Sequence, residues 1–308
     1  MRIAVIGAGG VGGYFGGWLA AAGADVAFVA RGAHAAAIRA NGLRIESAGG
    51  DLNVPVTVFD APGPIGTVDV VLVAVKLWDT DALLPQLRPL LGPQTMVISL
   101  QNGVAKDELL RAALGVEHIA GGLCYIAVVI DRPGVIKHTG TMQRLIVGEY
   151  GGAETPRLRA FVDACRGAGI NIETSADIER ALWEKFVFIN GLSGATCAVR
   201  QPIGPIRSDP HARELLRQLF AETVAVGRAR GVALDPGFAE ERLAFCDGLP
   251  PVMRASMAED LERGNRIEMP WFQGFVVAAG RSAGVPTPAN AFVEAVLSPY
   301  ANGTPKAP

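Results

Sequence analysis

A lysine at the edge of an apolar run is the residue of this sequence that is best suited to chemistry. In "ALWEKFVFINGLSG", Lys185 is followed directly by four apolar residues, 186–189. A partly buried ammonium group can stabilise negative charge that develops on a substrate oxygen and can deliver a proton to it as a general acid. The alternative is structural: Lys185 ends a polar half-helix at 177–185, and its ammonium reaches water along an apolar stem. From this helix alone the structural interpretation is the stronger one.

A glycine-rich loop near the start of the chain predicts a dinucleotide site. "IGAGGVG" places Gly7, Gly9 and Gly12 in G-x-G-x-x-G spacing after an apolar strand and at the start of a helix. In that context the first glycine permits a tight turn, the second lets the backbone approach a diphosphate, and the third lets helix and strand pack closely. The candidate phosphate-binding residues are Gly7, Gly9, Gly10, Val11 and Gly12. The alternative is a packing turn without a ligand.

The second strand predicts which dinucleotide binds. An acidic residue after this strand would bind a ribose 2′-hydroxyl and select NAD. Here the strand at 24–30 is followed by Arg31, and Asp25 lies at its other end. A guanidinium group is planar, always charged and able to bond two oxygens of a 2′-phosphate. We therefore expect NADP(H), with an ordinary surface arginine as the alternative.

Two further polar residues follow buried strands. Lys76 closes "VLVAVK" and Asn102 closes "ISLQNG". Ligands of doubly wound sheets lie outside the carboxyl ends of the strands, so both residues are expected in the cofactor cleft. A solvated lysine at a strand end and a turn residue before Gly103 are the structural alternatives.

These residues need a scaffold, and the chain predicts one in two parts. Strands and helices alternate at first, and runs that are apolar on both faces suit a parallel sheet covered by helices. Extended segments at about 116–150 are broken by "RPG" and "TGT", which predict turns, and strand signals stop after about residue 176. We expect a doubly wound α/β domain at 1–176 and an all-helical domain at 177–308, with one helix over "EDLERGNRIEMPWFQGFVVAAGRSAG".

Composition limits the classes of function. Half of the 308 residues are hydrophobic and the net charge is -2, which argues against nucleic acid as a partner. The start resembles no signal peptide and no apolar run reaches membrane-spanning length, so a cytoplasmic location is expected. The four cysteines form no CxxC pair and no metal-binding pattern with histidine, so no metal is expected. The apolar helical part is compatible with a homodimer.

Five motifs in sequence order resemble the ketopantoate reductases, also called 2-dehydropantoate 2-reductases. They are "GAGGVG", "VAVKLWD" with Lys76, "SLQNGV" with Asn102, "LWEKF" with Lys185, and "SMAEDLERGNRIE" with Ser256 and Glu268. The motifs run along nearly the whole chain, which makes the resemblance more specific than the glycine loop alone. It implies a Rossmann domain, a helical domain with a cleft between them, and NADPH-dependent reduction of ketopantoate to (R)-pantoate in pantothenate biosynthesis.

The resemblance also implies roles for individual residues. Lys185 resembles the catalytic lysine of the family and Glu268 its partner carboxylate. Ser256 resembles a hydroxyl that contacts the substrate, Asn102 the polar residue between nicotinamide and substrate, and Lys76 a lysine of the cleft. Two of these have structural alternatives: Ser256 starts a capping box with Glu259, and Glu268 lies in a charged surface-like segment.

The sequence departs from the family at two positions after the lysine. Members of the family that are better known have asparagine four and eight residues later, where this chain has Ile189 and Ser193. At about 100° per residue, Asn190 lies roughly 140° round the helix from Lys185 and cannot replace the first of them. Ser193 can still donate a hydrogen bond to a substrate, and Gln273 stands where a shorter amide is expected.

These departures leave the identity of the 2-keto acid open. The alternatives are a related NADP-dependent reductase of another 2-keto or 3-hydroxy acid, and a non-catalytic NADP(H)-binding sensor.

Overall fold

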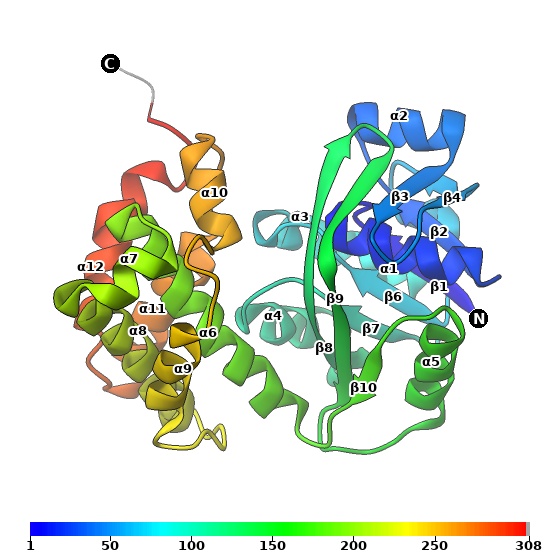
Figure 1. Cartoon of the computed structure of the whole chain (residues 1–308). Helices are drawn as coiled ribbons and strands as arrows, with labels where there is room; N and C mark the ends of the chain where they lie inside the picture. Colours follow the sequence, from blue (N-terminus) through cyan, green and yellow to red (C-terminus); the bar gives the residue numbers. More distant parts are fainter. Residues whose placement is uncertain (306–308) are drawn as a thin grey trace. The chain divides into compact units, whose positions relative to one another are not determined.

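The computed structural model describes residues 1–305, which form two compact units. Met1–Asn102 and Lys106–Ile178 make up the first unit, and the chain from Glu179 onward makes up the second together with Gly103–Ala105. The first unit is an α/β unit and the second is helical (Figure 1).

Six parallel strands form the centre of the first unit. They are β1 (Arg2–Ile6), β2 (Asp25–Val29), β5 (Thr57–Phe59), β6 (Val70–Val73), β7 (Met96–Ser99) and the start of β8 (Ile119–Arg132). Their spatial order is β5-β2-β1-β6-β7-β8. This is the doubly wound order in which the chain reverses direction across the sheet beside β1, so the predicted fold class is confirmed.

The sheet continues beyond β8 as a mixed extension. β8 pairs in antiparallel register with β9 (Val135–Glu149), which is flanked by β3 (Leu43–Ser47) and β10 (Ile172–Thr174), and β3 pairs with β4 (Leu52–Val54). The turn predicted at "RPG" joins β8 to β9. The turn predicted at "TGT" is wrong, because β9 runs through it. Pairing moves there from His138 to Gln143 while β8 advances only from Val128 to Ile126, so the extra residues form a bulge.

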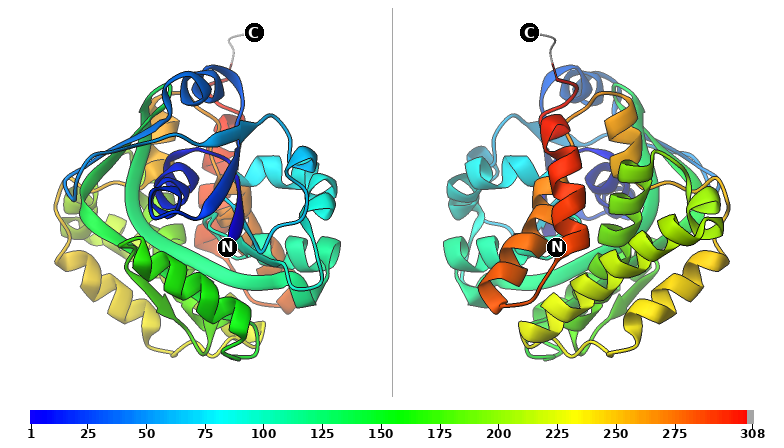
Figure 2. Two further views of the ribbon diagram at one scale, coloured as in Figure 1. Left: turned by 90° about the vertical axis from the view of Figure 1, so that its right-hand side faces the viewer. Right: turned by 90° about the vertical axis from the view of Figure 1, so that its left-hand side faces the viewer.

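The extended sheet curls round the first helix, α1 (Gly10–Ala21). In Figure 2 the long β8–β9 ribbon curves past α1, with α2 (Gly32–Asn41) near one end of that ribbon. Glycines of α1 make this close approach possible. A Cβ atom on Gly13 would lie 2.9 Å from Ile136 of β9, and one on Gly17 would lie 2.7 Å from Ile45 of β3.

Both faces of the parallel strands are buried, as the continuous apolar runs predict. Along β1, Ile3 and Val5 pack in the core around α1, and Ala4 and Ile6 pack in a second core on the other face. Helices α3 (Thr80–Leu87) and α4 (Ala105–Leu114) contribute to the second core, and α5 (Pro156–Gly167) contributes to the first. Short 3-10 turns η1 (Gly63–Ile65), η2 (Leu77–Asp79), η3 (Arg88–Leu90) and η4 (Val116–His118) complete the unit.

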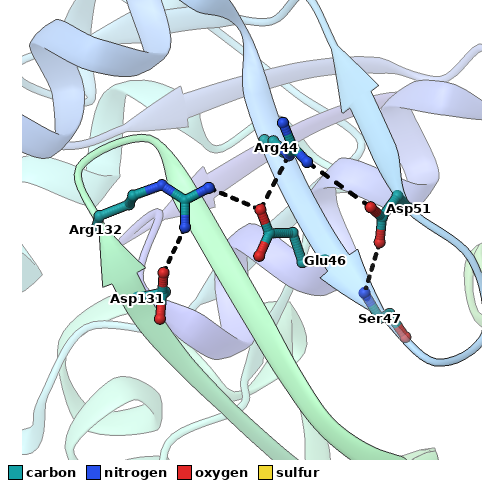
Figure 3. A network of polar contacts seen from close by, with 6 residues as sticks. All are labelled: Arg44, Glu46, Ser47, Asp51, Asp131 and Arg132. Carbon is teal, nitrogen blue, oxygen red and sulfur yellow. Dashed lines mark hydrogen bonds and ion pairs between the residues drawn. The ribbon is translucent and has the colours of Figure 1, made fainter.

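Ion pairs connect the β8–β9 ribbon, at the turn between its two strands, to β3 (Figure 3). The Glu46 carboxylate accepts from Arg132 at 2.7 Å and lies 3.1 Å from the Arg44 guanidinium. Arg132 also pairs with its neighbour Asp131, and Asp51 accepts from the amide of Ser47. The pairs are partly exposed, so each stabilises the fold only slightly.

The second unit contains seven α-helices within the described residues. They are α6 (Ile178–Val199), α7 (Ile203–Ser208), α8 (Pro210–Ala229), α9 (Phe238–Asp247), α10 (Ser256–Glu262), α11 (Gln273–Ala283) and α12 (Pro288–Leu297), with 3-10 turns η5 (Met269–Trp271) and η6 (Ser298–Tyr300). None of the helices in residues 1–305 combines the length and the apolar character that a membrane span requires.

The single helix expected over α10 and α11 is wrong. Arg263 ends α10, and Gly264 has φ +72°, a left-handed conformation that stops a helix. Pro270 then stands at the start of η5, where its ring disfavours helical geometry at the preceding residue. The break places Glu268 in a connecting segment.

Candidate functional site

The topology brings the predicted cofactor residues of the first unit to one edge of the sheet. β2, β1, β6 and β7 are adjacent and parallel, so their carboxyl ends lie side by side. Arg31 follows β2, the glycine loop follows β1, Lys76 follows β6 and Asn102 follows β7. Lys76 and Asn102 lie three residues beyond their strands rather than closing them. This edge is where doubly wound sheets bind ligands.

Three glycines of the loop are required by the protein itself. Gly7 has φ +102°, and a Cβ atom on it would lie 2.9 Å from the carbonyl of Ala74. A Cβ on Gly12 would lie 2.1 Å from the carbonyl oxygen of Gly7, and one on Gly10 would lie 2.7 Å from that of Val128. Contacts at these distances would force the backbone to move. The loop therefore holds its shape by packing against the sheet.

Gly9 is different, because nothing within the protein requires it to be glycine. Its φ is -68°, and no other atom of residues 1–305 lies within 4 Å of the position a Cβ would take. Gly9 is the N-cap of α1, whose first turn has neither a side-chain cap nor an acidic residue. An open position at a helix N-terminus suits the close approach of an anionic group to backbone N–H donors. The residues present therefore fit the diphosphate of a dinucleotide.

Two cationic residues follow β2 and β6, the strands on either side of β1, which carries the glycine loop. Arg31 is the exposed N-cap residue of α2 and precedes Gly32, which has φ +63°. Its guanidinium has no hydrogen-bond or ion-pair partner anywhere in residues 1–305. Lys76 is exposed, and its ammonium lies 5.5 Å from the centre of the Trp78 ring, at cation–π distance.

Asn102 lies on a short segment held by buried polar groups. The Ser99 hydroxyl donates to Gln101 Oε1 at 2.9 Å, and Gln101 Nε2 donates to the Thr80 hydroxyl at 2.8 Å. Asn102 itself is half-buried, and Gly103 behind it has φ +87°. The network joins the segments that follow β6 and β7, which are the segments that carry Lys76 and Asn102.

A fully buried lysine that sequence reasoning missed anchors the same segment. Lys106 Nζ donates to the carbonyl oxygens of Ser99 at 2.9 Å and Gly122 at 3.2 Å, and it pairs with the Asp107 carboxylate at 3.1 Å. Burial raises the pKa of Asp107, and the charge and hydrogen bond of Lys106 oppose that rise. No local signal distinguishes Lys106 from a surface lysine in "VAKDELL", since the two carbonyl groups that accept from it belong to β7 and β8.

Lys106→Met is expected to lower the free energy of unfolding by about 3–5 kcal/mol, because it leaves the buried Asp107 carboxylate without its partner. The double variant Lys106→Met/Asp107→Asn removes both charges and should recover part of that loss. Denaturant titration of the wild type and both variants measures the effect. A single variant as stable as the wild type would contradict the assigned role of the pair.

In the helical unit, the predicted catalytic pair is buried. Lys185 is 8% exposed and lies on α6 beside Phe186 and Val187, both 0% exposed. Glu268 is 7% exposed and immediately precedes η5, where its carbonyl accepts from the amide of Trp271. The interpretation of Lys185 as a solvated end of a polar half-helix, and of Glu268 as a surface acid, is therefore wrong. Buried charges of this kind require polar or charged partners.

Ser256 does not cap its helix. Ala255 is the N-cap of α10, its carbonyl accepts the first helical bond from Ala258, and no side-chain cap is formed. The capping box predicted with Glu259 is wrong because the helix starts one residue too early for it. Ser256 is exposed at the first helical position.

The positions after Lys185 divide between two environments. Ile189 is half-buried and Ser193 is 3% exposed. Asn190 points elsewhere, as its angular position predicts: its Nδ2 donates to the Thr223 hydroxyl at 2.9 Å and to Asn290 Oδ1 at 2.8 Å. Gln273 Nε2 donates to the Asn190 carbonyl at 2.8 Å, so this longer amide forms a buried hydrogen bond within the helical unit.

Comparison with known proteins agrees with this geometry. Residues 3–152 match the family described as Ketopantoate reductase PanE/ApbA, and residues 177–301 match the C-terminal part of that family. A Bacillus subtilis protein named "Uncharacterized oxidoreductase YkpB" is 33% identical, with 97% of this chain and 99% of the relative covered. A 2-dehydropantoate 2-reductase of Mesorhizobium japonicum is 32% identical, with 97% and 96% covered.

A solved structure gives the same result. The crystal structure of 2-dehydropantoate 2-reductase from Geobacter metallireducens superposes with a TM-score of 0.88 at 32% identity, with 97% of this chain and 99% of that chain covered. The resemblance drawn from five motifs is thus confirmed over both units. Both parts of the family model match this chain, and the relatives are similar over nearly their whole length. The chain therefore belongs to the ketopantoate reductase family.

Proposed function

We propose that this protein reduces 2-dehydropantoate to (R)-pantoate with NADPH. The observation that carries the proposal is the arrangement of Arg31, the glycine loop, Lys76 and Asn102 after four adjacent parallel strands. The names of the relatives, which cover nearly the whole chain, support the substrate. In this proposal residues 1–176 bind the cofactor and contribute Asn102, and residues 177–308 carry the other catalytic and substrate-binding groups.

When bound, the nicotinamide supplies the hydride that reduces the keto carbon. Lys185 stabilises the negative charge that develops on the carbonyl oxygen and donates a proton to it, which yields the hydroxyl group and leaves Lys185 as a neutral amine until solvent reprotonates it. Glu268 holds the ammonium in position. The proposed substrate contacts are the hydroxyls of Ser256 and Ser193 and the amide of Asn102.

The cysteines take no part in this chemistry. All four are buried and none forms a disulfide within residues 1–305, and burial raises the pKa of Cys165 and Cys197 to about 12. Thiols in that state are poor nucleophiles at neutral pH. Buried cysteines that are not in disulfides suit a reducing compartment, and we place the enzyme in the cytoplasm.

NADP(H) selection is assigned to Arg31. Arg31→Ala should raise the Kd for NADPH about tenfold to a hundredfold, since charge-assisted bonds are worth about 1.5–3 kcal/mol, and should change the Kd for NADH little. Fluorescence titration of both cofactors measures this. Arg39→Ala is the matched control, because Arg39 lies on the same helix and pairs with Asp60 at the surface. Equal weakening of both cofactors would remove Arg31 from 2′-phosphate recognition.

The test of the activity is a steady-state assay in two directions: ketopantoate and other 2-keto acids with NADPH and NADH, and 3-hydroxy acids with NADP+ and NAD+. We expect the highest kcat/KM for ketopantoate with NADPH. Faster turnover of another acid would identify a related reductase, which the isoleucine at 189 makes the main alternative. Tight NADPH binding without turnover of any carbonyl compound would identify a sensor.

A further inference from the structure

A histidine outside the predicted site bridges three segments around the glycine loop. His34 lies in the first turn of α2 and is half-buried. Its Nε2 lies 2.8 Å from the carbonyl oxygen of Ala8, which stands between Gly7 and Gly9. Its Nδ1 accepts from the amide of Gly134 in the turn between β8 and β9, at 3.0 Å. One imidazole ring thus joins the α2 start, the glycine loop and the β8–β9 turn.

These two bonds define the state of the ring. Nδ1 must be unprotonated, because it accepts a hydrogen bond from a backbone amide that can only donate. Nε2 must carry the proton, because the Ala8 carbonyl can only accept. The tautomer with its proton on Nε2 therefore satisfies both ring nitrogens.

The turn that donates to His34 is itself held by its neighbours. Gly134 has φ +82°, and a Cβ on it would lie 3.1 Å from the Cβ of Ala37, so the turn packs directly against α2. The carbonyl of Gly134 also accepts from the amide of Arg44 in β3 at 3.0 Å. The ring therefore links the glycine loop to a rigid part of the curled sheet.

We propose that His34 is a positioning residue for cofactor binding, which rests on the NADP(H) function proposed above. By holding the Ala8 carbonyl, it keeps the peptide before Gly9 in one orientation and leaves the opposite side of the loop open. Arg31 lies three residues before His34, at the N-cap of the same helix. The bridge thus fixes the distance between the loop that receives the diphosphate and the cation that receives the 2′-phosphate.

Near-isosteric variants separate the two bonds. In His34→Gln the longer side-chain amide can still donate to the Ala8 carbonyl but no longer accepts at the Nδ1 position. In His34→Asn the shorter side chain can accept from the Gly134 amide but does not reach Ala8. His34→Leu removes both bonds. Circular dichroism and thermal unfolding establish that each variant folds, and Arg39→Ala is the control on the same helix.

The measurement is the Kd for NADPH and for NADH, with kcat at saturating NADPH. His34→Leu is expected to raise the Kd for NADPH about tenfold, as loss of about 1.4 kcal/mol requires. His34→Asn should resemble His34→Leu, and His34→Gln should stay within about threefold of the wild type, while kcat changes less than about twofold. The Kd for NADH should rise less than that for NADPH, because NADH has no 2′-phosphate for Arg31 to bind. This difference between the two cofactors should disappear when His34→Leu is made in the Arg31→Ala background, because the two residues act as one unit.

The outcomes separate this proposal from the function on which it rests. Wild-type protein that binds neither dinucleotide would overturn the proposed function. Wild-type binding of NADPH, beside unchanged Kd values in the Leu and Asn variants, would overturn only the role of His34. If His34→Leu still raised the Kd for NADPH more than that for NADH in the Arg31→Ala background, the role of His34 would also be overturned. The bridge would then not act through Arg31.

Discussion

Lys185→Ala is expected to lower kcat for ketopantoate reduction by a factor of about 10²–10⁴, the usual contribution of a positioned general acid. NADPH binding should remain within about twofold, because the glycine loop and Arg31 are untouched. The physical reason is that an alkoxide forms on the substrate oxygen during hydride transfer, and alanine offers it neither charge nor proton. Single-turnover kinetics with saturating NADPH measure the effect directly on the chemical step.

Two controls sharpen the result for Lys185. Arg180→Ala removes an exposed cation of the same helix, paired with Glu184 at 2.8 Å, and should leave kcat unchanged. Lys185→Arg keeps the charge, but a guanidinium group does not give up its proton near neutral pH, so most of the loss should remain. A kcat for Lys185→Ala within a few-fold of the wild type would mean that another group protonates the product.

Gly9→Ala is expected to raise the Kd for NADPH at least about tenfold while costing at most about 1 kcal/mol of stability. A Cβ at this position meets no atom within 4 Å in the part of the chain that the structure describes, so the fold accommodates the methyl group. A cofactor diphosphate that lies against the loop backbone would not. Fluorescence titration and thermal unfolding of one sample give both quantities.

Gly12→Ala is the matched comparison. Its Cβ would lie 2.1 Å from the Gly7 carbonyl oxygen, so the loop must move, and the free energy of unfolding should fall by about 1–3 kcal/mol or more. The same methyl group thus separates a glycine kept for the fold from one kept for a ligand. If Gly9→Ala bound NADPH like the wild type, the diphosphate would not approach the loop at Gly9.

The ends of α10 differ from those that the sequence predicts, because helix boundaries depend on one or two residues whose signals compete. Ser256 has the sequence of a capping box, yet the backbone places Ala255 at the cap. In the same way, "TGT" has turn residues, but pairing along both sides of β9 keeps the chain extended and absorbs the extra residues as a bulge.

The sequence alone determined the doubly wound sheet, the glycine loop at its edge and the family, because apolar periodicity and motif order are properties of local segments. Only the tertiary structure decided that Lys185 and Glu268 are buried, that Gly9 faces open space and that Lys106 and His34 hydrogen-bond to backbone groups of distant segments. His34 and Gly134 are 100 residues apart in sequence. A hydrogen bond between such residues depends on how the sheet curls, and no local pattern carries that information.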